Sequence, residues 1–190
     1  MTRAPKALSL LTLPVLFALI FILSATNEPS AQGTGGARVY SDQQEGWVED
    51  MAGMRHYSGL RCPDLVGPLA RAKVLAADAD RVAGCIYLGR DGINAILRKH
   101  VPGSGRQSTY LFKKNYSSAG FQQVQLTGVS ASGVSFKTRQ RGDRVYIETM
   151  WQFEGEKADF TLWLYYILPK HETDIAATLE AFKVMLARQN

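Results

Sequence analysis

The chain has 190 residues, of which 46% are hydrophobic and 10% are aromatic. This composition excludes a disordered protein, and the length excludes two full-sized domains. The formal net charge is +5, but two of the 22 basic residues, Arg3 and Lys6, precede a long apolar segment, so 20 basic and 17 acidic residues leave about +3 for the rest. With so small an excess and no recognition motif, we do not expect a nucleic-acid partner.

The N-terminus has the pattern of an export signal. Two cations lie within Met1–Lys6, and residues 7–25 follow without a charge. This apolar segment is longer than most signal-peptide cores and close to the roughly 20 residues that cross a bilayer as a helix. Residues 1–25 are therefore either a cleaved signal peptide or a signal anchor. Because the cationic flank stays inside, we expect an exported domain, periplasmic or otherwise extracytoplasmic, that is soluble or tethered through residues 7–25.

The segment after the leader separates it from the folded part. Residues 26–38 are rich in Gly, Ser, Thr and Pro, which predicts a flexible linker. A single exported α+β domain is then expected over residues 39–190.

The two cysteines predict a disulfide, because an exported domain lies where disulfides persist. Joining Cys62 to Cys85 would stabilise the fold by about 3 kcal/mol in the chain-entropy picture. A redox-active pair is the alternative, but such pairs usually have C-x-x-C spacing, which these cysteines lack.

The middle of the chain contains a predicted hairpin and an ambiguous segment. The apolar runs 83–88 and 93–99 flank Gly-Arg-Asp-Gly, a turn signal. Residues 109–116 could form a helix or a strand, and we favour the helix.

The second half predicts an antiparallel meander, with strands over residues 121–126, 134–139, 144–153 and 159–168 separated by glycine-containing turns. Strict alternation in 144–153 places Ile147, Thr149 and Trp151 on one face. Residues 160–168 are apolar on both faces, which is typical of a central strand covered on both sides. A C-terminal helix over residues 171–188 is predicted by Ile175, Leu179, Phe182 and Leu186, which recur on one stripe.

These elements predict an α+β fold, an antiparallel sheet of about five to seven strands with a packed C-terminal helix. The order of elements loosely resembles the Mog1/PsbP-like fold, in which helices pack on an antiparallel sheet. That resemblance is one of fold and implies no function.

No motif assigns catalytic, cofactor-binding or metal-binding residues. His56, His100 and His171 have no recognisable partner motif, and no pair of them has metal-ligand spacing. The segment around His56 carries polar and turn residues beside the predicted disulfide, which is the pattern of a rigid polar site. We favour the structural interpretation, in which the disulfide pins an irregular N-terminal segment to the sheet.

Two basic groups are candidate surface patches. The first comprises Arg98, Lys99, Lys113 and Lys114, and the second comprises Lys137, Arg139, Arg141 and Arg144. Such patches attract anionic lipid head groups, although solvated strand ends account for the same charges. The aromatic residues Trp151, Trp163, Tyr165 and Tyr166 lie on adjacent predicted strands, where they form either a ligand-binding surface or part of the core.

Our leading hypothesis is a non-enzymatic exported envelope protein that binds a partner protein, a lipid or a small ligand through its sheet face or basic loops. The alternative is a small secreted hydrolase with a site near His56 or His100. A histidine within hydrogen-bond reach of a carboxylate or hydroxyl in a pocket would favour the alternative, whereas exposed histidines without partners would exclude it.

Overall fold

The computed structural model describes residues 46–189. The expected leader and linker, residues 1–25 and 26–38, lie outside the described residues. Within residues 46–189, no helix is both long enough and apolar enough to span a membrane.

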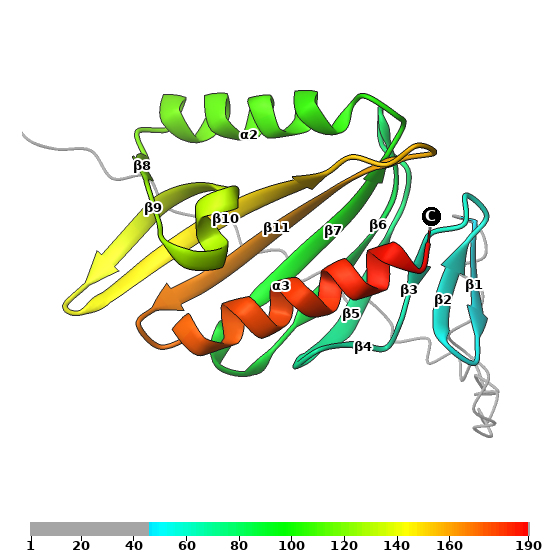
Figure 1. The fold of residues 1–190 in the computed structure, drawn as a ribbon, viewed down its shortest axis with the longest axis horizontal. Coiled ribbons are helices and arrows are strands. Elements are labelled where there is room, and N and C mark those ends of the chain that lie inside the picture. The colour runs from blue at the N-terminus through cyan, green and yellow to red at the C-terminus, as the bar shows by residue number, and fades with distance from the viewer. Residues whose placement is uncertain (1–45, 190) are drawn as a thin grey trace, which may run out of the picture. The chain divides into compact units, whose positions relative to one another are not determined.

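An eight-stranded antiparallel sheet forms the centre of the domain, with strand order β4-β5-β6-β7-β11-β10-β9-β8 (Figure 1). Its strands are β4 (Leu65–Val66), β5 (Leu69–Leu75), β6 (Arg81–Leu88), β7 (Asn94–His100), β8 (Gln122–Val124), β9 (Val134–Arg141), β10 (Arg144–Phe153) and β11 (Asp159–Leu168). A smaller antiparallel sheet contains β1 (Trp47–Asp50), β2 (Gly53–His56) and β3 (Arg61–Cys62). The helices are α2 (Gly105–Ser118), α3 (Glu172–Ala187) and the short 3-10 turns η1 (Arg90–Gly92) and η2 (Gly128–Ser132).

The α+β class, the antiparallel sheet and the C-terminal helix are confirmed. So are the hairpin of β6 and β7, the meander from β8 to β11 and the helical state of residues 109–116, which lie inside α2. The sheet has eight strands because β4 and β5 also join it. β4 spans only two residues, and β5 has an irregular register between Arg71 and Lys73, so neither shows an alternating pattern in the sequence.

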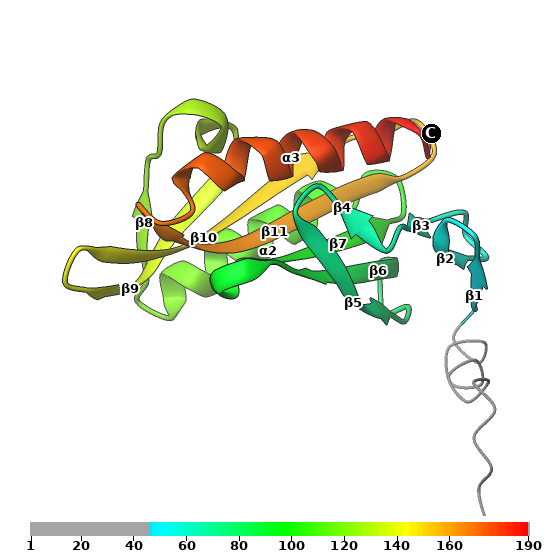
Figure 2. The ribbon, with the colours of Figure 1, turned by 90° about the horizontal axis from the view of Figure 1, so that it is seen from below.

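The two helices cover opposite faces of the main sheet (Figure 2). On one face, the predicted apolar stripe of α3 is buried, and the ring of Phe182 packs edge-on against Tyr87 with centroids 5.4 Å apart. On the other face, Phe112 and Tyr116 of α2 pack against Phe136 of β9. The contacts of α2 are mainly with β8 to β11, the half of the sheet formed by the C-terminal meander.

The predicted disulfide is confirmed. Cys62 of β3 and Cys85 of β6 are joined, with their Cα atoms 6.2 Å apart, and both are fully buried. The bond therefore ties the smaller sheet to the main sheet through the core.

Candidate ligand-binding groove beside α2

A groove of about 650 Å³ lies between α2 and the main sheet. Its apolar floor includes Ile86, Ile96 and Trp163, and its wall includes Leu111, Phe112 and Tyr116 of α2. The floor follows from strand register, because Ile96 is paired with Ile86 on one side and Trp163 on the other. Cross-strand partners share a face, so these three side chains form one continuous surface.

A carboxylate holds two aromatic rings at the border of this groove. Glu148 of β10 accepts hydrogen bonds from the Trp163 indole N–H, at 3.1 Å, and from the Tyr116 hydroxyl. Burial and the bond to Glu148 raise the pKa of Tyr116, so its phenol stays protonated and remains a donor. The contact fixes the orientation of one ring from the sheet and one from α2.

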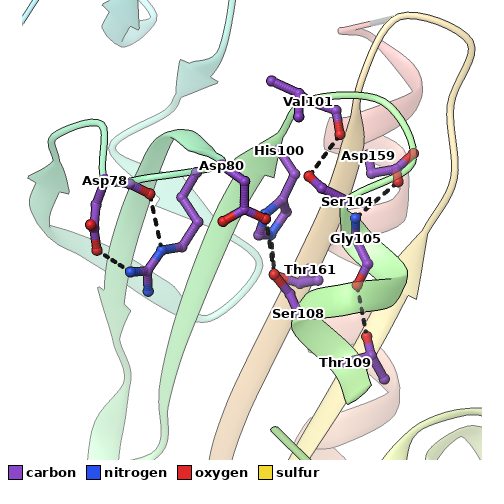
Figure 3. A network of polar contacts seen from close by, with 11 residues as sticks. Asp78, Asp80, His100, Val101, Ser104, Gly105, Ser108, Thr109, Asp159 and Thr161 are labelled. Atoms are coloured by element: carbon purple, nitrogen blue, oxygen red, sulfur yellow. Dashed lines mark hydrogen bonds and ion pairs between the residues drawn. The ribbon is translucent and has the colours of Figure 1, made fainter. Parts of the chain in front are cut away.

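His100 lies at the polar end of the groove, where Asp80, Ser108 and Thr161 surround it (Figure 3). Its Nε2 atom is 2.8 Å from the Thr161 hydroxyl oxygen, and its Nδ1 atom is 3.4 Å from that of Ser108. A carboxylate oxygen of Asp80 is 3.8 Å from the same Nδ1.

The surroundings of His100 favour its neutral form. Its side chain is only 1% exposed, and burial lowers its pKa, while Asp80 acts in the opposite direction. A neutral imidazole beside two hydroxyls and a carboxylate can accept a proton from a hydroxyl or a bound molecule.

All three histidines are buried, but only His100 lines this groove. His56 packs against the rings of Trp47 and Tyr57. Its Nδ1 accepts the Ser58 backbone N–H and lies 2.9 Å from the Ser58 hydroxyl oxygen, but it does not line the groove. His171 precedes α3, and its Nδ1 accepts the Ile167 backbone N–H at 3.0 Å. His56 therefore contributes to packing, and His171 stabilises the turn between β11 and α3.

The structure does not gather the first basic group on one surface. Arg98 and Lys99 are neighbours on β7 and point to opposite faces. Arg98 donates to the Ala76 carbonyl, and Lys99 donates to the Ser58 carbonyl. Lys113 and Lys114 are exposed on α2. Only Arg98 belongs to the groove.

The second basic group is partly gathered at the tip of the β9–β10 hairpin. Arg141 pairs with Arg144, and Arg139 pairs with Tyr146, so these three arginines share a face. An irregular register between Tyr146 and Ile147 pairs Lys137 with Ile147 on the other face. Arg139 also lies over the Tyr146 ring, 5.6 Å from its centroid.

The aromatic residues named from sequence divide between the two faces. Trp151 and Tyr166 are buried in the core with α3, whereas Trp163 and Tyr165 are half-buried on the α2 side. Five polar residues in or beside the groove were not identified from sequence, namely Asp80, Ser108, Tyr116, Glu148 and Thr161. They come from three elements and one loop, namely α2, β10, β11 and the loop between β5 and β6, and no local motif connects them.

No protein-family model, curated protein sequence or solved structure matches this chain. Among residues 46–189, no group of three His, Cys, Asp or Glu side chains could hold a metal ion.

Proposed function

We propose that this protein is a non-enzymatic exported binding protein whose groove beside α2 holds a small, mainly apolar ligand. The groove itself is the observation that carries the proposal. Its volume of about 650 Å³ falls within the range of roughly 300–1,000 Å³ typical of ligand sites. Its lining combines aliphatic and aromatic side chains with polar and charged groups that can orient a ligand.

Two further features support the proposal. The hydrogen bonds of Glu148 to Trp163 and Tyr116 hold the border rings in place before a ligand arrives, which lowers the entropic cost of binding. The Cys62–Cys85 disulfide is compatible with an extracytoplasmic location, where the export signal would deliver the domain.

The test uses N-phenyl-1-naphthylamine, a neutral apolar dye whose emission rises when it leaves water. We expect saturable binding at one site and at least tenfold weaker binding in an Ile96→Lys variant, because the ammonium would lie on the groove floor. The matched control is Val184→Lys, which places the same charge in a second apolar hollow between α3 and β4. Absence of saturable binding, or loss of binding only in the control variant, would overturn the proposal.

A second candidate function is ester or amide hydrolysis with His100 as general base. The observation that favours it is the imidazole in the groove, with the Thr161 hydroxyl on Nε2 and the Asp80 carboxylate nearest Nδ1. Hydrolases with a hydroxyl nucleophile use the same chain of groups: the nucleophile contacts a histidine base, and a carboxylate on the other side of the ring orients that base. Against it, Thr161 is only 3% exposed, and Ser108 shares Nδ1 with Asp80.

Hydrolysis of p-nitrophenyl butyrate tests this candidate directly. An enzyme would release nitrophenol above the buffer rate, and His100→Gln and Thr161→Val would each abolish that release. Ser104→Ala, which changes a hydroxyl outside the groove lining, should leave it unchanged. Hydrolysis at the buffer rate would reject the candidate and leave the binding function as proposed.

A further inference from the structure

Arg98 places a cation at the polar end of the groove. It lies on β7 opposite Thr161 of β11, so its side chain emerges on the same face as the groove floor. One of its guanidinium nitrogens donates to the Ala76 carbonyl at 2.9 Å. The remaining N–H groups of a guanidinium form a fork suited to a carboxylate or a phosphate.

The Arg98 side chain has room to lie across β6 because its cross-strand partner there, Gly84, has no side chain. Gly84 of β6 pairs with Arg98, and a Cβ atom on Gly84 would lie 2.6 Å from Arg98 Cδ. The aliphatic stem of Arg98 therefore crosses β6 through the space that Gly84 leaves open. This placement orders the guanidinium before any ligand binds.

The charge of Arg98 is not neutralised by an ion pair. Within residues 46–189, no carboxylate lies within ion-pair distance of its guanidinium. The charged groups that act on it are Arg81, which lines the groove, and Asp78, and these two are paired with each other. Burial lowers the pKa of Arg98 and Arg81 lowers it further, while the Asp78 carboxylate acts in the opposite direction. The net direction is downward, which means that the cation is held at an energetic cost. An anion beside Arg98 would offset that cost.

We infer that this end of the groove binds the oxyanion head group of an amphipathic ligand, such as a carboxylate, while the apolar part of the ligand lies along Ile96 and Trp163. The inference rests on the proposed binding function and adds the class of ligand. The other groove-lining carboxylate, Asp80, is directed to His100.

The experiment compares decanoate, decan-1-ol and decylamine as competitors for bound N-phenyl-1-naphthylamine. The three molecules share one alkyl chain and differ in head-group charge. We expect decanoate to compete at least tenfold more strongly than decan-1-ol, and decylamine to compete least. Arg98→Met keeps an unbranched stem across Gly84 but removes the charge, so it should abolish the preference for decanoate and leave decan-1-ol unchanged.

Arg144→Met is the matched control, because Arg144 is exposed at the tip of the β9–β10 hairpin and does not line the groove. It should retain the full preference for decanoate. Equal competition by all three molecules, a preference for decylamine, or an equal loss in the control would overturn the inference while leaving the binding function intact. Failure of the dye to bind the unmodified protein would instead remove the binding function itself.

Discussion

The carboxylate of Asp159 accepts a hydrogen bond from the backbone N–H of Gly105, with 3.0 Å between Oδ2 and the nitrogen, and both residues are buried. The bond joins the start of β11 to the first turn of α2, where backbone N–H groups have no partner within the helix. A Cβ atom on Gly105 would lie 2.8 Å from Asp159 Cβ, so this close approach requires glycine. The pair therefore positions the helix that forms the groove wall.

Replacing Asp159 should loosen the attachment of α2. In Asp159→Ala, the Gly105 N–H loses its acceptor, and we expect the free energy of unfolding to fall by about 1–2 kcal/mol. Urea denaturation measures this change. Ser104→Ala, one residue before the helix, should stay within about 0.5 kcal/mol of the unmodified protein because Ser104 does not cap the helix with its side chain. Equal losses in the two variants would show that the Asp159 contact has no special part in holding α2.

Loss of the disulfide should destabilise the whole domain. The bond closes a long loop with a sequence separation of 23 residues, so a Cys62→Ala/Cys85→Ala variant should lose about 3 kcal/mol of unfolding free energy. Reducing agent should produce a similar loss in the unmodified protein and none in the double variant. Alkylation of both cysteines in the native protein without reduction would contradict the bond.

Stability should decrease as the solution becomes acidic. Burial lowers the pKa of His100 and of His171 below the usual value of 6.5, although Asp80 and Asp174 respectively oppose the shift. The unfolded chain then binds more protons than the folded chain below that pH, so the stabilisation is complete above pH 6.5 and is lost as the pH falls toward the folded-state pKa values.

Urea midpoints measured between about pH 7.5 and pH 5 would show this slope. A His171→Gln variant should show a shallower slope, since it removes one of the two groups. A slope that is unchanged in His171→Gln and in His100→Gln would assign the acid sensitivity to other groups.

Removing Glu148 should disturb the groove border. In Glu148→Ala, the Tyr116 hydroxyl and the Trp163 indole lose their shared acceptor, and we expect a loss of about 1–3 kcal/mol in unfolding free energy together with a shift of the Trp163 emission to longer wavelength. Tryptophan fluorescence during urea denaturation reports both effects. The exposed residue Glu156 provides the control, because Glu156→Ala should change neither quantity. An unaltered spectrum in Glu148→Ala would mean that the carboxylate does not order the indole.

Much of the architecture could be predicted because its signals are local. The alternation of apolar and polar residues in β10, the Asp-Gly turn after β6 and the apolar stripe of α3 each depend on residues close together in the chain. The smaller sheet and β4 could not be predicted because their strands are two to four residues long, which is too short to show a periodicity.

The groove could not be predicted in the same way. Its opposite sides come from α2 and from strands far apart in the sequence, and Ile96 meets Trp163 only through the register of β7 with β11. Arg98 and Lys99 also could not be placed from sequence. Counting charges puts them in one basic group, but on a strand their side chains point to opposite faces of the sheet.

The sequence by itself determined the α+β class, the antiparallel meander, the C-terminal helix and the cysteine pair, since hydrophobic periodicity, turn chemistry and cysteine number are properties of the chain read in order. Only the tertiary structure decided which histidine lies in a groove, which arginine faces it and which aromatic rings frame it. Those relationships depend on strand register and on the face that each helix covers, and a shift of one residue in register reverses every side chain along a strand.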